Sequence, residues 1–336
     1  MHRAMHLLCA ASVLFLFFAH TTPLLASSQY FRAGKKEDSH PKPTFGIAMM
    51  GGGEDLDDAF RFLCQKAHGG DFLILRAHGD DDYNPYIDGL CKLNSVATLI
   101  IPDRDSARDP QVAAIIRQAE ALFIAGGDQS RYVNFWKGTP VQDAVNSQIA
   151  RGVPIGGTSA GLAVLGEFGY GALADKPDDN DLASSQVLPN PYFSRVTLVR
   201  DFLKISLLRD SITDSHFAKR DRMGRTLGFL ARLMEDRWSS HPREIAIDER
   251  SAVLVEPDGK STVVGPGRGA YFLRPTRRPK KCQPDMLLNF GGISAYRAPA
   301  GSHFNLRTWK GNGGQSYTLA VDQGKILSTQ KGSEVY

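Results

Sequence analysis

The stretch VPIGGTSAGLAV, from Val153 to Val164, decides the fold, because it passes from an apolar strand through a tight turn into a helix-forming segment. The turn has the pattern Gly-x-Ser-x-Gly, with Ser159 at its centre. Such a turn holds the serine in a strained backbone conformation and presents its Oγ at the edge of a sheet. The flanking Gly157 and Gly161 leave room where a Cβ would collide with a neighbouring element. We predict that Ser159 is a nucleophile; the alternative is a glycine-rich turn without chemistry.

Short apolar runs alternate with helical patterns on the N-terminal side of this turn. The runs lack polar alternation and are separated by helices, which is typical of a parallel sheet buried on both faces. The sequence therefore predicts an α/β fold with a doubly wound, mostly parallel sheet and flanking helices, with its site at the carboxyl ends of the strands. The expected strands are 45–50, 72–75, 96–101, 121–125 and 153–156, and the expected helices are 56–67, 112–121 and 141–151.

The chain divides into four segments by composition. Residues 1–26 have the charge and apolar pattern of a signal peptide cleaved near Ala26, and 27–43 are polar and predict a linker. Residues 44–285 form the main domain, and 286–336 form a β-rich extension packed on it. The later strands are expected at 252–255, 262–264, 271–273 and 317–321.

Composition excludes several function classes. The net charge is +4 over 336 residues, and Arg3 is the one charged side chain of 1–26, so 4 − 1 = +3 remains. That charge is too small to indicate a nucleic-acid or membrane-surface partner. The signal peptide predicts a secreted or periplasmic protein without a stable membrane anchor. In an oxidising compartment Cys64 and Cys91 could form a disulfide, or they could remain thiols like Cys282.

Other motifs supply candidate partners for the serine. His216 lies in the run Asp214-Ser215-His216, and the alternative for it is a loop histidine without a role. The backbone N–H groups of Ala160 and Gly127 could bind an oxyanion. No Walker or dinucleotide pattern and no zinc or calcium spacing occurs, so we expect neither cofactor nor metal.

Two charged groups could bind substrate. Arginines follow His216 at spacings of four, six and nine and could clamp a carboxylate, although a solvated helix face is the alternative. These are Arg220, Arg222 and Arg225. An acidic loop could bind a guanidinium or could simply be solvated, and its carboxylates are Asp175, Asp178, Asp179 and Asp181.

Four blocks in order resemble the S51 serine peptidase family, which contains cyanophycinases and aspartyl dipeptidase. They are 123–129, 157–161, 214–217 with the three arginines, and 247–249. The resemblance implies a flavodoxin-like fold related to class I glutamine amidotransferases, usually as a homodimer. It implies a triad of Ser159, His216 and Glu249, with a substrate pocket that includes Gln129, Asp214, Ser215 and the arginines. The implied reaction is hydrolysis of cyanophycin, a polyaspartate with arginine on each β-carboxyl, to β-Asp-Arg dipeptides.

Ser215 departs from the family pattern, because cyanophycinases usually have glutamine there; this bears on substrate preference. One alternative is an α/β-hydrolase esterase that uses Ser159, Asp214 and either His241 or His303. Another is an exported binding protein that keeps the fold without the chemistry.

Overall fold

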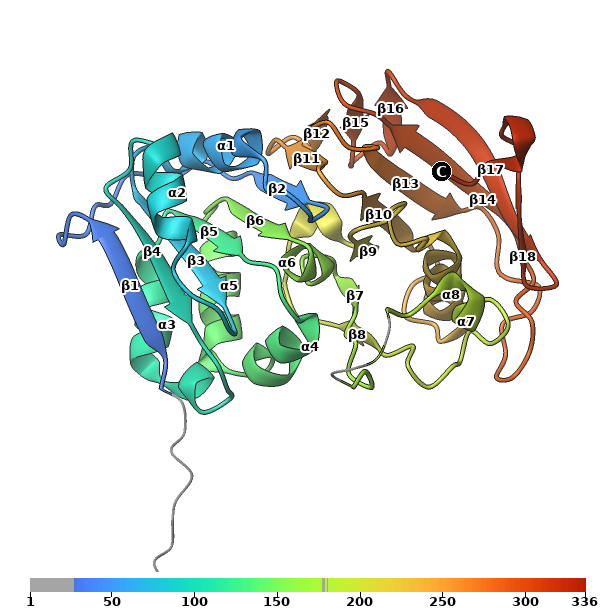
Figure 1. Cartoon of the computed structure of the whole chain (residues 1–336), viewed down its shortest axis with the longest axis horizontal. Helices are drawn as coiled ribbons and strands as arrows, with labels where there is room; N and C mark the ends of the chain where they lie inside the picture. Colours follow the sequence, from blue (N-terminus) through green and yellow to red (C-terminus); the bar gives the residue numbers. More distant parts are fainter. Residues whose placement is uncertain (1–26, 177–178, 180) are drawn as a thin grey trace, which may run out of the picture.

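The computed structural model describes residues 27–176, 179 and 181–336. The expected signal peptide, 1–26, lies outside these residues. A ten-stranded sheet runs from the N-terminal half of the molecule into the C-terminal half, and its strands β4, β3, β5, β6 and β2 run parallel (Figure 1). In spatial order the strands are β1 (Gln29–Gly34), β4 (Ser95–Ile100), β3 (Asp71–Arg76), β5 (Ala121–Ile124), β6 (Ile155–Thr158), β2 (Ile47–Met50), β11 (Ala252–Val255), β12 (Lys260–Val264), β15 (His303–Asn305) and β16 (Lys310–Asn312).

Helices cover both faces of the parallel strands. Alternate residues of β3 point to opposite faces, so Phe72 packs with the helices α1 and α2, while Leu73 packs with α3 and α5. The four helices are α1 (Asp57–Ala67), α2 (Tyr83–Leu90), α3 (Pro110–Gln118) and α5 (Pro140–Ala150). The predicted α/β fold with flanking helices is confirmed.

A second, eight-stranded sheet lies in the C-terminal half and is largely antiparallel (Figure 1). Its spatial order is β18 (Lys325–Ser328), β17 (Gln315–Asp322), β14 (Phe290–Ala298), β13 (Ala270–Pro275), β10 (Arg243–Ile247), β9 (Ser211–Asp214), β7 (Phe168–Tyr170) and β8 (Leu198–Arg200). The buried helix α8 (Met223–Glu235) packs on one face together with α7 (Ser184–Val187). Residues 286–336 thus add strands to both sheets. The remaining short helices are η1 (Ser106–Arg108), α4 (Gln129–Arg131), η2 (Tyr132–Trp136), α6 (Ala160–Ala163), η3 (Ser206–Leu208) and η4 (Lys331–Ser333).

The prediction of a linker at 27–43 is wrong for its first half. Residues Gln29–Gly34 form β1, which pairs antiparallel with β4 over its whole length. The Arg32 guanidinium also contacts the Asp71 carboxylate at 3.0 Å. The strand β1 lies at the edge of the sheet and is mostly exposed, so backbone pairing with β4 stabilises it rather than apolar burial. Its sequence is therefore polar and lacks the alternation that predicts a strand.

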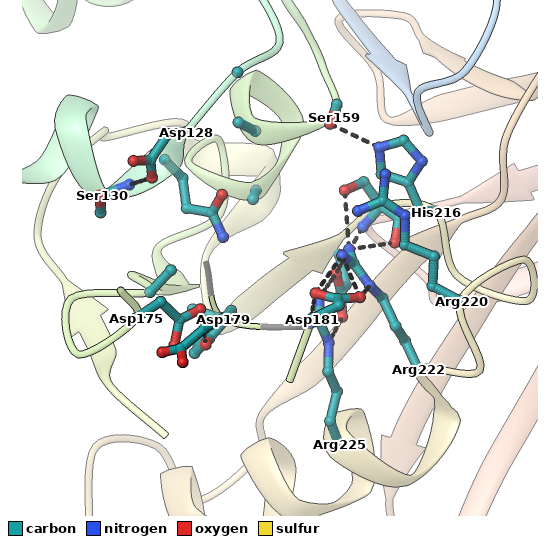
Figure 2. Close-up of a pocket in the computed structure, with 18 of the residues that line it drawn as sticks. Asp128, Ser130, Ser159, Asp175, Asp179, Asp181, His216, Arg220, Arg222 and Arg225 are labelled. Atoms are coloured by element: carbon teal, nitrogen blue, oxygen red, sulfur yellow. Dashed lines mark hydrogen bonds and ion pairs between the residues drawn. The ribbon is translucent and has the colours of Figure 1, made fainter. Parts of the chain in front are cut away.

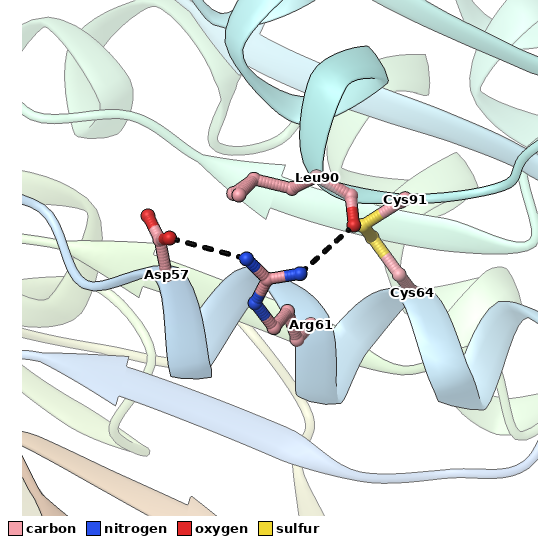
Figure 3. The surroundings of a disulfide bond; sticks show 5 residues. All are labelled: Asp57, Arg61, Cys64, Leu90 and Cys91. Carbon is pink, nitrogen blue, oxygen red and sulfur yellow. Dashed lines mark hydrogen bonds and ion pairs between the residues drawn. A yellow bond between two sulfur atoms is a disulfide. The ribbon is translucent and has the colours of Figure 1, made fainter.

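A disulfide joins Cys64 of α1 to Cys91, the residue that follows α2, across a sequence separation of 27 (Figure 3). Beside it, Arg61 donates hydrogen bonds to the Leu90 carbonyl and the Asp57 carboxylate. Cys282 is a free, buried thiol whose pKa burial raises to about 12. In the described part of the chain, no helix has the length and apolar character needed to cross a membrane.

Candidate active site

Ser159 occupies the turn between β6 and α6 in a backbone conformation that side chains rarely adopt, with φ +52° and ψ −113°. The neighbouring glycines make this turn sterically possible. A Cβ on Gly161 would lie 2.0 Å from the Ile124 carbonyl oxygen, and one on Gly157 would lie 2.6 Å from the backbone of Gly161. The turn therefore has the strained, glycine-flanked form expected of a nucleophile elbow.

Ser159, His216 and Glu249 form one hydrogen-bonded chain. The Ser159 Oγ lies 2.7 Å from the His216 Nε2, and the His216 Nδ1 lies 2.7 Å from the Glu249 Oε1 (Figure 2 shows the first contact). The three residues follow β6, β9 and β10, whose carboxyl ends meet where the two sheets join. Because a carboxylate only accepts hydrogen bonds, Nδ1 carries the imidazole proton and Nε2 is free to accept one from the serine.

A glycine loop that the sequence reasoning left without a catalytic role holds the histidine. The His216 N–H donates to the Gly51 carbonyl at 2.7 Å, and a Cβ on Gly52 would lie 2.5 Å from the imidazole ring. His216 itself has a φ of +46°. The signal was the run Gly51-Gly52-Gly53 at the end of the first apolar strand, which allows the backbone to pass directly beneath the ring.

The environment keeps His216 suited to act as a base. Burial lowers its pKa below the usual histidine value, and the charges of Arg220 and Arg222 act in the same direction, while the bond to Glu249 opposes them. The imidazole is therefore neutral at neutral pH, which is the form that can accept a proton.

Arg222 and Arg225 are not available as a clamp in the way the sequence suggested, nor do they lie on a solvated helix face. Both are buried, and they pair with two carboxylates in a group that we call the buried ion cluster: Asp181, Asp214, Arg222 and Arg225. Arg225 binds Asp214 through Nε at 2.9 Å and Nη2 at 2.6 Å. Arg222 binds Asp181 through Nε and Nη2, each at 2.9 Å.

The buried ion cluster also fixes the residue beside the histidine. Arg222 donates from Nη1 to the Ser215 carbonyl at 2.8 Å and to its hydroxyl at 3.3 Å, and the Ser215 N–H donates to Asp214 at 2.8 Å. Ser215 thus has its polar groups engaged with the cluster. Arg220, in contrast, is exposed and has no ion-pair partner among the described residues.

A cavity of about 520 Å³ opens over Ser159 (Figure 2). Gly127, Gln129 and Ala160 line it, as do Arg220 and His216. Gln129 begins α4, and Gly127 has a φ of +131° in the loop before it. The cavity therefore contains every described residue that the sequence and the resemblance assigned to the site except Glu249, which lies behind His216.

The acidic loop forms one wall of this cavity, through Asp175, Asp179 and Asp181. Asp178 lies outside the described residues. Asp175 accepts from Arg195 at 2.7 Å and from the Tyr170 hydroxyl at 2.9 Å. Arg195 also lies 3.7 Å from Asp179, and Lys176 lines the same wall, so its carboxylates are partly compensated, while Arg220 carries positive charge near the histidine.

The esterase arrangement finds no geometric support. Neither His241 nor His303 lines the cavity, and the His303 Nδ1 lies 3.2 Å from the Thr262 hydroxyl. Asp214 is engaged by the two buried arginines instead of by a histidine.

Comparison with known proteins identifies the family of the chain. The model of peptidase family S51 matches residues 88–260, just over half of the chain. A cyanophycinase of Synechococcus elongatus is 28% identical over 264 residues, which is 74% of each chain. A cyanophycinase of Trichormus variabilis is 30% identical over 175 residues, 51% of each. The crystal structure of a peptidase from an acI-B1 Actinobacterium superposes with a TM-score of 0.47 at 15% identity, covering 85% of this chain and 98% of the other. The chain belongs to peptidase family S51, and it is a serine-type hydrolase similar to the cyanophycinases.

Proposed function

We propose that the protein hydrolyses cyanophycin or related aspartyl and isoaspartyl peptides to dipeptides such as β-Asp-Arg, through an acyl-enzyme on Ser159. The observation that carries the proposal is the hydrogen-bonded chain Ser159–His216–Glu249 at the base of a cavity that has both signs of charge. The similarity to cyanophycinases supports the substrate class.

In the first step His216 Nε2 takes the proton of the Ser159 hydroxyl while Oγ attacks the carbonyl carbon of the scissile amide. The N–H groups of Ala160 and Gly127 stabilise the oxyanion that forms. The imidazolium, stabilised by Glu249, then gives the proton to the departing amine, which leaves the acyl-enzyme. Water attacks the ester in the second step, with His216 again as the base, and the released acid restores Ser159.

Charge distribution supports an arginine-bearing substrate. Each unit of cyanophycin carries a guanidinium and a free carboxylate on its arginine branch. The wall that contains Asp175 and Asp179 suits the guanidinium, and the exposed Arg220 suits a carboxylate. Replacing Asp179 by asparagine should therefore raise KM for β-Asp-Arg substrates, and an unchanged KM would refute this role.

We also propose that the protein works outside the cytoplasm, as a secreted or periplasmic enzyme. The Cys64–Cys91 disulfide supports an oxidising compartment, because such bonds are rare in reducing cytosol. Homodimerisation stays a prediction from the family resemblance, which light scattering coupled to size exclusion can measure.

The decisive experiment incubates the protein with cyanophycin, with β-Asp-Arg oligomers and with plain Asp-X peptides, and measures product masses. Ser159→Ala should abolish product formation and labelling by a fluorophosphonate probe. His216→Ala should lower turnover by several orders of magnitude, while the matched exposed variant His241→Ala should not. Absence of both labelling and products in the wild type would favour a non-catalytic binding protein.

A further inference from the structure

A second cavity, of about 350 Å³, adjoins the one over Ser159 and has no role in the chemistry described so far. The two cavities share three lining residues, Gly127, Asp128 and Arg131. Figure 2 places Asp128 on the side of the pocket away from His216 and Arg220. The loop between β5 and α4, which we propose to supply an oxyanion donor, is therefore the boundary between the two cavities.

The far wall of the second cavity is a loop with specific internal hydrogen bonds. Arg76, the last residue of β3, donates to the His78 carbonyl at 3.1 Å, to the Asp80 carbonyl at 2.8 Å and to the Asp80 carboxylate at 3.0 Å. Gly79, with a φ of +116°, makes this wrapping possible, since a Cβ there would lie 2.2 Å from the Arg76 guanidinium. The loop holds His78 as an exposed side chain on the cavity wall.

Two exposed nitrogen-bearing side chains, His78 and Arg131, line the second cavity, whereas the charge of Arg76 is compensated by Asp80 at 3.0 Å. Its charged lining residues are Arg76, Arg131 and Asp128, and His78 adds a further nitrogen ligand. Asp128 is partly engaged, because its Oδ1 accepts from the Ser130 N–H at 2.8 Å and caps α4. Arg131 is about half exposed, and its nearest carboxylate oxygen, on Asp128, is 3.8 Å away. Because Arg131 and His78 can both donate hydrogen bonds into the cavity, a carboxylate is a group that they would bind.

We propose that the second cavity is a substrate subsite that binds the carboxylate of the polymer unit next to the one at Ser159. This inference rests on the proposed function, since a polymer of aspartyl-arginine units presents one carboxylate and one guanidinium per unit. The guanidinium of one unit would bind the acidic wall of the first cavity, and the carboxylate of the next unit would bind His78 and Arg131 in the second. The two arginine branches would then lie on opposite sides of the Gly127 loop. The subsite would make the enzyme prefer oligomers over single dipeptide units.

The test compares His78→Glu with the matched variant His241→Glu, since both histidines are exposed and only His78 lines a cavity. Substrates are a one-unit β-Asp-Arg amide and an oligomer of four units. We expect His78→Glu to raise KM for the oligomer about fivefold, with most of the change in KM rather than kcat, and to leave KM for the one-unit substrate within twofold. Arg131→Gln should act in the same direction. His241→Glu should match the wild type.

Binding to the inactive Ser159→Ala background gives an independent measurement. There, His78→Glu should weaken oligomer binding by a similar factor, measured by calorimetry as Kd. Equal KM and Kd for the two glutamate variants would refute the subsite alone. If the wild type cleaves no oligomer and Ser159→Ala binds none, the proposed function fails and the subsite with it.

Discussion

Replacing Asp214 by asparagine removes a charge from the centre of the buried ion cluster. Asp214 is 3% exposed and accepts hydrogen bonds from Arg225, from Arg222 and from the Ser215 N–H. Removing one partner of a buried ion pair costs about 3–5 kcal/mol, because the other charge stays buried without compensation. Asp181, whose side chain is 36% exposed, still contacts both arginines and should hold the loss at the lower end, about 3 kcal/mol.

Calorimetry and urea unfolding at pH 7 measure this loss directly. A loss of about 3 kcal/mol should lower Tm by roughly 5 °C for a protein of this size. The matched control is Asp105→Asn, which breaks a pair with Arg108 whose side chains are 58% and 60% exposed. Such surface pairs contribute less than about 1 kcal/mol.

The pH dependence of stability should change in the same variant. Burial alone would raise the pKa of Asp214, but the charges of Arg225 and Arg222 outweigh it and lower the pKa below the usual aspartate value. A lowered folded-state pKa gives stability that is present above the unfolded value and is lost as pH falls toward the folded one. The wild type should thus lose this contribution below about pH 4, and Asp214→Asn should lack that part of the acid response.

Catalysis gives the result that would refute the link to the active site. The cluster holds Ser215 next to the strained His216, so Asp214→Asn should lower kcat even at temperatures where the variant is folded. A stability loss no larger than that of Asp105→Asn would refute the structural role. A normal kcat in a clearly destabilised variant would refute the positioning of the histidine.

Three further predictions concern separate sites. Burial, with added repulsion from Asp71, raises the pKa of Glu120 to about 7, so the folded state holds a proton that the unfolded state releases. The free energy of unfolding should therefore fall as the pH rises from about 4.5 to 7. Glu120→Gln should remove this pH dependence, and equal pH dependence of the two proteins in urea titrations would contradict the argument. The charge of Arg220 lowers the pKa of His216, so Arg220→Gln should move the acid limb of the kcat/KM profile to higher pH, and an unmoved limb would show that the charge is screened. The loop of 27 residues closed by the disulfide predicts a loss of about 3.5 kcal/mol for Cys64→Ser/Cys91→Ser, and a loss under 1 kcal/mol would contradict the loop-entropy argument.

The sequence predicts the parallel half of the fold because its strands are apolar on both faces. In runs such as 72–75 and 121–125 every side chain is apolar, which is typical of a strand in a parallel sheet that is covered on both faces. The strand β1 is exposed and is specified by pairing with β4, so it has no such pattern. Likewise β7 and β8 are three residues each, too short to show a period.

For the site, the sequence predicts the local geometry of the nucleophile turn but not the side-chain pairs between distant segments. The Ser159 turn is specified by its own glycines, and His216 is a candidate from its own run, but Glu249 came only from a resemblance covering distant blocks. No local signal showed that the arginines after His216 point into a buried cluster, because spacing gives the face of a helix and not what covers that face. Their partner Asp181 lies 41 residues before Arg222 and belongs to a loop without periodicity.

Both reacting residues are held at positive φ, which non-glycine residues adopt only at a cost of about 1–3 kcal/mol each. That cost must be offset by contacts around each residue, and the contacts differ. Ser159 lies in a turn whose glycines are closely packed, and its N–H donates to the Met50 carbonyl at 3.2 Å. The His216 N–H donates to the Gly51 carbonyl, and Arg222 holds the neighbouring Ser215. The backbone bond of Ser159 to Met50 involves no ionised group, but the contacts that hold Ser215 beside His216 depend on the ionisation of the buried ion cluster. The histidine, not the serine, is therefore the member of the triad whose position should respond to changes made outside the cavity.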